Sequence, residues 1–109
     1  MERIYNKLVR DNIPSIIEGK GETPITRILN EEEYKKELEK NLYEEYNEVL
    51  EASGEDRVEE LADMIEVIKY LAKLEGKKLE DVIKTADEKS IKRGAFNDRI
   101  FLEKVIEDK

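Results

Sequence analysis

The sequence contains no cysteine and no histidine. The absence of cysteine excludes disulfide bonds and thiol nucleophiles, and the absence of histidine excludes imidazole bases and the usual zinc and iron sites. Any metal bound by this chain must therefore accept oxygen ligands alone. Hard cations prefer carboxylate and water oxygens, which leaves Mg²⁺, Mn²⁺ and Ca²⁺ as the metals to consider.

The sequence also lacks long apolar runs. No stretch approaches the roughly 20 apolar residues of a membrane span. The first residues, Met1 to Ile4, lack the apolar core of a signal peptide. We therefore expect no membrane partner and a cytoplasmic location.

Positive charge is scarce relative to negative charge. Lysine and arginine number 20 against 28 aspartates and glutamates, a net charge of −8. Such a surface repels a phosphate backbone, so duplex nucleic acid is not expected as a partner. Although 44% of the residues are charged, the apolar residues fall in periodic groups, so we expect one folded domain over residues 1–109.

This periodicity predicts an all-α fold, a bundle of about four helices. Asp11 and Pro14 mark the start of a short helix that ends near Glu18, and Asn30 is the expected cap of the next helix. The three longer helices are expected over residues 31–52, 55–75 and 79–93, each followed closely by a glycine or ending at one.

Two segments outside these helices have the composition of strands. Residues 25–29 contain the run Ile25-Thr26-Arg27-Ile28, and residues 99–105 are rich in β-branched and aromatic side chains. Residues 99–105 could form either a strand or a docked helix; we favour a strand that pairs with residues 25–29 as a short two-stranded β element.

The expected helix over residues 58–74 is apolar around most of its circumference and leaves only a narrow polar stripe. A helix of this kind needs neighbours on nearly every side. The other helices of so short a chain can hardly supply them, so we expect a homo-oligomer, either a dimer or a tetramer.

Acidic residues interrupt the apolar faces of two helices. With about 100° of turn per residue, Glu45 lies in the middle of an apolar stripe and Glu48 lies beside it one turn later. On the next long helix Glu60 falls among apolar residues, with Asp63 one turn away. Four carboxylates gathered on buried faces require a cation, and Mg²⁺ or Mn²⁺ fits the oxygen ligands. The alternative is a solvated acidic face, because acidic pairs arise by chance among 28 acidic residues.

These residues also match a known pattern. Residues 44–48 (EEYNE) and 60–63 (ELAD) resemble the E-E-x-x-E … E-x-x-D signature of the MazG-like all-α NTP pyrophosphatase superfamily. Residues 6–14 (NKLVRDNIP) resemble the K-L-V-R-D-x-I-P block of a short MazG-like branch, and residues 92–96 (KRGAF) loosely resemble its K-x-R-G-x-F region. Asn12 departs from the pattern, since many relatives have lysine there.

The resemblance implies a helical, oligomeric fold and Mg²⁺-dependent hydrolysis of nucleotides between the α- and β-phosphates. Carried over by position, it implies Glu45, Glu48, Glu60 and Asp63 as metal ligands, with Glu44 and Glu45 as catalytic candidates. The chain lacks the aromatic-histidine pair usual in the phosphoribosyl-ATP pyrophosphohydrolase of histidine biosynthesis, which makes that substrate the second choice.

An all-carboxylate site needs basic side chains to bind a triphosphate. The candidates are Lys7, Arg10, Lys89, Lys92 and Arg93. Their simpler roles are surface ion pairs for the first two and helix-dipole stabilisation for the last three. Two other functional classes remain open: a non-catalytic helical interaction module, and a nucleotide-binding sensor without turnover.

Overall fold

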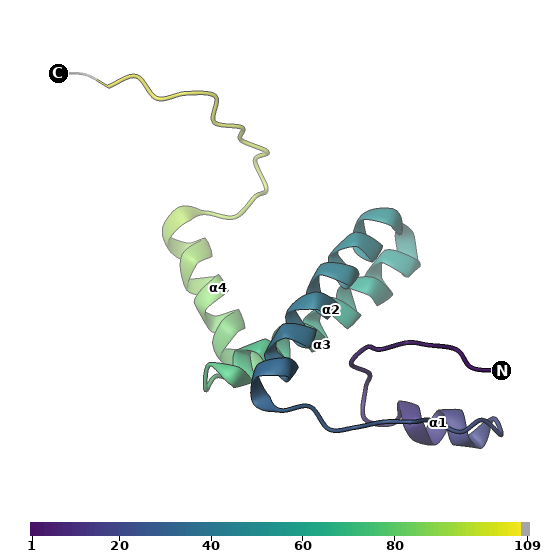
Figure 1. Cartoon of the computed structure of the whole chain (residues 1–109). Coiled ribbons are helices and arrows are strands. Elements are labelled where there is room, and N and C mark those ends of the chain that lie inside the picture. The colour runs from purple at the N-terminus through teal and green to yellow at the C-terminus, as the bar shows by residue number, and fades with distance from the viewer. Residues whose placement is uncertain (108–109) are drawn as a thin grey trace.

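Four helices make up the regular secondary structure of the described part of the chain (Figure 1). The computed structural model describes residues 1–107, and within them the helices are α1 (Ile13–Gly19), α2 (Glu31–Glu51), α3 (Gly54–Leu74) and α4 (Leu79–Arg93). The expected all-α fold class is confirmed, and the three longer helices begin and end within one residue of their expected positions. None of the described helices is long and apolar enough to cross a membrane.

α2 and α3 lie side by side as an antiparallel hairpin (Figure 1). The start of α2 is fixed by Asn30, whose side-chain Oδ1 accepts a hydrogen bond from the backbone N–H of Glu33 at 2.9 Å. The Glu33 carboxylate in turn accepts from the backbone N–H of Asn30 at 3.4 Å, which completes a capping box. Asn30 was the expected cap, and the structure confirms it.

The turn of the hairpin is short because only Ala52 and Ser53 separate the two helices. Gly54 has a φ of +59°, a left-handed conformation that glycine adopts without strain. The Arg57 Nε–H donates to the carbonyl oxygens of Val49, at 3.1 Å, and Ala52, at 2.9 Å. These bonds satisfy carbonyl groups that the end of α2 leaves without a helical partner. Arg57 thus joins the end of α2 to the start of α3.

α4 leads away from the hairpin (Figure 1). Its first residue, Leu79, is half-buried, and the rest of the helix is exposed. Three apolar side chains of α4 lie uncovered: Val82, Ile83 and Ile91, which are 38%, 51% and 85% exposed. α4 therefore contributes little to a core within one chain.

The expected β element does not form in the part of the chain that the structure describes. Residues 25–29 and 99–105 have no helical or strand assignment, and no backbone hydrogen bond joins them. The reason lies in the direction of α4, which carries the C-terminal segment away from residues 25–29 (Figure 1). The prediction of a strand pair within the chain was wrong.

The chain is much more open than a compact domain of its length. Its radius of gyration is 19.3 Å, against about 13 Å for a compact 109-residue domain. Its accessible surface is 10387 Å², against about 6,300 Å² for a folded monomer of this mass. Among the described residues only Leu38 and Ala72 are buried. A single chain in this conformation lacks a core of its own.

Candidate metal centre

Four carboxylates meet between the two helices of the hairpin. Glu45 and Glu48 lie on α2, and Glu60 and Asp63 lie on α3; we refer to these four residues as the carboxylate cluster. Glu45, Glu60 and Asp63 each offer one carboxylate oxygen, and the three oxygens lie within 4.8 Å of one another. Glu48 lies close enough to Glu45 and Glu60 to raise the pKa of both carboxyl groups. The two acidic pairs singled out from their spacing are thus brought together.

Two oxygens of the carboxylate cluster are buried without a partner. Oε2 of Glu45 and Oε2 of Glu60 have no hydrogen-bond donor, and the same holds for Oδ1 of Asn41. Asn41 lies one turn before Glu45 on the same side of α2. A buried acceptor without a donor costs free energy, and a cation bound to the carboxylate cluster would offset this cost for the oxygens of Glu45 and Glu60.

The pKa of the Glu45 carboxyl is raised to about 7. Desolvation by burial is the largest cause, followed by the hydrogen bond and the negative charge of Glu48, with Asp63 adding to the repulsion. The pKa of Glu60 is also raised, first by its hydrogen bond with Glu48 and then by burial. Both shifts have the direction expected of partly buried carboxyl groups that lie beside other carboxylates.

The donor set fits a hard divalent cation. Ligand distances of about 2.1 to 2.5 Å let such an ion span oxygens up to about 4 to 5 Å apart, and the three oxygens of the cluster lie within 4.8 Å of one another. The ligand atoms are all oxygens, and two of them are buried without any other partner. Mg²⁺ and Mn²⁺ are the ions this chemistry favours.

The raised pKa of Glu45 leads to a prediction about pH. In the unfolded chain this carboxyl has its ordinary pKa of 4.5, so between about pH 4.5 and 7 only the folded state keeps the proton. The free energy of unfolding of the metal-free protein should therefore fall as the pH rises through this window. Urea melts at pH 5, 6, 7 and 8 in EDTA measure this fall.

Mg²⁺ should diminish the fall, because the ion binds the deprotonated carboxylates and gains affinity as the pH rises. Glu45→Gln should also diminish it, since glutamine does not titrate. A free energy of unfolding that stays level or increases from pH 5 to 8 in EDTA would contradict the raised pKa.

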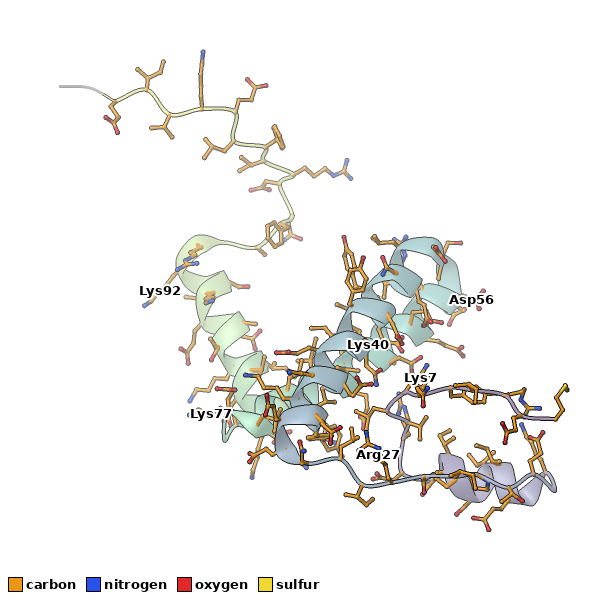
Figure 2. The ribbon with its side chains drawn as sticks, viewed as in Figure 1. Lys7, Arg27, Lys40, Asp56, Lys77 and Lys92 are labelled. Carbon is orange, nitrogen blue, oxygen red and sulfur yellow. The ribbon has the colours of Figure 1, made fainter. Side chains whose placement is uncertain are left out.

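The N-terminal segment contacts the cluster and its surroundings. The Arg10 Nη2–H donates to Oδ1 of Asp63 at 2.7 Å, and Lys7 Nζ lies 3.7 Å from a carboxylate oxygen of Glu44. Between them, the Asn41 Nδ2–H donates to the backbone carbonyl of Leu8 at 3.4 Å. Two of the five basic candidates, Lys7 and Arg10, are thus beside the acidic residues (Lys7 is labelled in Figure 2).

The other three basic candidates lie elsewhere. Lys89, Lys92 and Arg93 belong to the last turns of α4. Figure 2 shows Lys92 at the end of α4, well away from Lys7. Within one chain the structure does not bring these three residues to the carboxylate cluster, and their place at a helix C-terminus suits the helix dipole.

The two sides of the hairpin differ in chemistry. Relative to Glu45 and Glu60, which face each other, the next residues Tyr46 and Leu61 turn by about 100°, and because the helices are antiparallel both reach the same side. We name this side the apolar face. Its exposed residues, each between 43% and 66% exposed, are Tyr43, Tyr46, Leu50, Val58, Leu61 and Ile65.

The opposite side, which we name the open face, is polar. By the same helical geometry, Asn41, Glu44, Glu48 and Asp63 turn toward it by roughly 40° to 100°. The N-terminal segment contacts three of these four residues, which agrees with their lying on one side. Glu48 is exposed there, so the carboxylate cluster is reached from the open face.

Asn41 was not among the candidates from sequence. The sequence feature that could have indicated Asn41 is its position four residues before Glu45, where a polar side chain interrupts the same apolar stripe. In the sequence, one asparagine among many polar residues did not stand out, and its hydrogen bond to Leu8 depends on a contact between distant parts of the chain.

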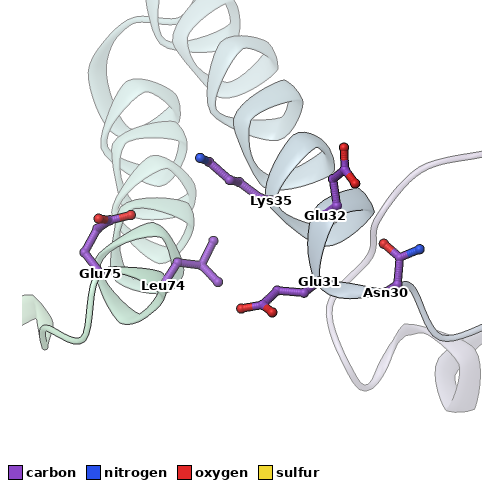
Figure 3. A pocket seen from close by; sticks show the side chains of 6 residues that line it. All are labelled: Asn30, Glu31, Glu32, Lys35, Leu74 and Glu75. Atoms are coloured by element: carbon purple, nitrogen blue, oxygen red, sulfur yellow. The ribbon is translucent and has the colours of Figure 1, made fainter.

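A groove on the molecule lies away from the carboxylate cluster. It has a volume of about 530 Å³ and lies at the open end of the hairpin, where α2 begins and α3 ends (Figure 3). Its lining residues are Asn30, Glu31, Glu32, Lys35, Leu74 and Glu75. Three carboxylates against one ammonium disfavour a phosphate ligand, and none of the buried unpartnered oxygens lies in this lining.

Comparisons with known proteins leave the family open. No protein-family model matches the chain. Over 50 residues, 46% of the chain, it is 42% identical to an uncharacterized protein of Mycolicibacterium smegmatis (strain ATCC 700084 / mc(2)155). The match covers 51% of that protein, so the chain spans about half the length of this curated relative. No solved structure matches.

Proposed function

We propose that the chain is a Mg²⁺-dependent nucleoside triphosphate pyrophosphohydrolase that produces a nucleoside monophosphate and pyrophosphate. The observation that supports this proposal most directly is the pair of buried, unpartnered oxygens of Glu45 and Glu60 within the carboxylate cluster. Its second support is the match of residues 44–48 and 60–63 to the MazG-like signature. Removal of damaged or non-standard nucleotides is one use of such an activity.

Glu45, Glu48, Glu60 and Asp63 are the residues that would hold Mg²⁺. When bound, the ion would neutralise the carboxylates and polarise phosphate oxygens as a Lewis acid. Arg10 and Lys7, on the open face, would bind the outer phosphates with charge-assisted hydrogen bonds. These cations offset part of the repulsion between a triphosphate and the acidic residues.

The chain's own proton acceptor would be Glu45. Glu45 would take the proton of a water molecule as its oxygen bonds to the α-phosphorus, and the bond from that phosphorus to the bridging oxygen would break. Pyrophosphate leaves as one unit. Glu44 is the second candidate for the base, although in the metal-free chain its carboxylate faces Lys7.

The products of hydrolysis in ¹⁸O-labelled water test this proposal. With Mg²⁺ and a set of standard, deoxy and oxidised nucleoside triphosphates, phosphorus NMR should show pyrophosphate and a monophosphate that carries the label. Glu39→Gln, an exposed acid of α2 outside the cluster, serves as the control and should give the same products at the same rate. Orthophosphate and a diphosphate as the first products would contradict the proposal.

We further propose that the chain functions as a homo-oligomer. The accessible surface of one chain exceeds that of a compact monomer by about 4,100 Å², and each chain of an obligate dimer buries about 1,000 to 2,500 Å² or more. The apolar face is the best surface for the contact, because it is continuous across α2 and α3 and lies opposite the open face. A second copy packed there leaves the carboxylate cluster accessible to a nucleotide.

A further inference from the structure

The N-terminal segment crosses the open face as a strap. We define the strap as residues 7–10, which touch α2 through Glu44 and Asn41 and α3 through Asp63. Leu8 is the only half-buried residue among the first ten, so the strap is anchored at its middle. One short segment thus bridges both helices at the entrance to the carboxylate cluster.

Arg10 is the cation of the carboxylate cluster in the metal-free chain. Within residues 1–107, no other basic side chain forms an ion pair with Glu45, Glu48, Glu60 or Asp63. The Arg10 guanidinium reaches Oδ1 of Asp63 through one nitrogen and leaves the buried oxygens of Glu45 and Glu60 without a partner. Arg10 therefore compensates only part of the negative charge.

The contacts of the strap are weak enough to exchange. The side chains of Arg10 and Asp63 are 58% and 44% exposed, and the Lys7–Glu44 pair is similarly exposed at a longer distance of 3.7 Å. Exposed ion pairs of this kind contribute little stability. A divalent cation that binds several carboxylates at once can displace a single-point guanidinium contact from Asp63.

Displacement would also be driven by charge. A cation bound between Glu45, Glu60 and Asp63 puts two positive charges beside the Arg10 guanidinium, which repel it from Asp63. The released guanidinium has five N–H donors suited to phosphate oxygens. It is then free on the side from which a metal-bound polyphosphate enters.

We propose that Arg10 is a built-in counter-ion of the metal centre, which a divalent cation displaces from Asp63 and which then binds the phosphates of the substrate. This inference rests on the proposed metal-dependent function. It assigns Arg10 two successive partners, Asp63 before the metal binds and a phosphate afterwards. It also makes residues 7–10 a strap that opens when metal arrives.

The test is the effect of Arg10→Gln on two affinities. Mn²⁺ alone, measured by calorimetry, should bind the variant about 2- to 5-fold more tightly than wild type, the range expected when an exposed ion pair no longer competes. A non-hydrolysable α,β-methylene nucleoside triphosphate, with saturating Mn²⁺, should bind the variant at least about tenfold more weakly, because charged hydrogen bonds to phosphate are lost. A residue with a merely structural role would weaken both.

Arg3→Gln is the matched control. Arg3 forms an exposed ion pair with Glu22 at the same distance, 2.7 Å, in the same N-terminal segment but away from the carboxylate cluster. Both affinities should equal those of wild type. A wild type that binds no Mn²⁺ overturns the metal-dependent function and this inference together. If wild type binds Mn²⁺ but Arg10→Gln binds it with unchanged or weaker affinity, this inference alone is overturned. If Arg10→Gln binds the nucleotide with unchanged affinity, the second role of Arg10 is overturned.

A second measurement keeps Arg10 in place, so its outcome does not depend on how Arg10→Gln folds. Because the chain has no cysteine, Ile4→Cys, at an exposed position before the strap, accepts a single spin label. Mg²⁺ should sharpen the electron paramagnetic resonance spectrum of this label as the strap is released. An unchanged spectrum at Mg²⁺ concentrations that raise the Tm would overturn the opening of the strap.

Discussion

Glu45→Gln should lower turnover at least about 10³-fold, corresponding to about 4 kcal/mol of transition-state stabilisation. The substitution keeps nearly the same volume but removes a metal ligand and the proposed proton acceptor. Lewis-acid stabilisation by a metal contributes several kcal/mol, so weakening the site and removing the base together justify this magnitude. Steady-state rates with saturating Mg²⁺ and nucleotide measure it.

The same variant should not be less stable than wild type when metal is absent. At pH 8 wild-type Glu45 is ionised although its surroundings raise its pKa to about 7, and glutamine removes that repulsion. Mg²⁺ should raise the Tm of wild type, since a ligand at a hundredfold excess over its Kd stabilises the folded state by about 2.7 kcal/mol. The rise should be much smaller in Glu45→Gln. Activity and metal-free stability would then change in opposite directions, as expected at a strained site.

Glu39→Gln is again the control for these melts, because Glu39 is exposed on the same helix and should leave activity and the metal response at wild-type values. A solvated acidic face gives a different outcome. In that case Glu45→Gln would change neither the metal-free stability nor the metal response by more than about 0.5 kcal/mol. A full metal-induced rise of Tm in Glu45→Gln would exclude Glu45 from the site.

Light scattering after size exclusion should give a mass of at least twice the 12.8 kDa of the chain. Leu61→Glu, in the middle of the apolar face, should shift this mass toward the monomer and lower the Tm by more than about 10 °C. Within one chain Leu61 is already 43% exposed, so its replacement would cost little in a monomer. In an assembly that covers the apolar face, the new carboxylate would be buried without a partner, at a cost of several kcal/mol.

Glu59→Lys is the matched control for the apolar face. Glu59 is exposed on α3 and turns about 100° from Glu60 toward the open face, away from Leu61. The mass should not change in this variant. A wild-type mass near 12.8 kDa at micromolar concentration, or a Leu61→Glu variant with wild-type mass and Tm, would contradict assembly through the apolar face.

The helices could be predicted from sequence because their ends carry local signals. Asn30 caps α2 as expected and forms a capping box with Glu33, and Gly94, with a φ of +86°, follows α4 where a glycine was expected. Each signal acts within a few residues of the chain. The prediction of a β element was wrong because that element required a contact between distant segments. The direction of α4 decides where the C-terminal segment lies (Figure 1).

The candidate site could likewise be predicted only in part from the sequence. The meeting of Glu45, Glu60 and Asp63 follows from helical periodicity on two helices joined by a two-residue turn. The pairing of Arg10 with Asp63 joins residues 53 positions apart, and no periodicity indicates it. Lys7 and Arg10 were singled out by their charge and by the motif around them. That Lys7 pairs with Glu44 and Arg10 with Asp63 is known only from the structure.

The short turn between α2 and α3 also has a kinetic consequence. The hairpin brings together residues that are close in sequence, so it can form by itself, quickly and in a single chain. If a second chain covers the apolar face, as we propose, the later step of folding is bimolecular. Refolding of such an oligomer would show a fast phase independent of protein concentration and a slower one that accelerates with it. The carboxylate cluster, which lies wholly within the hairpin, would be assembled in the first phase.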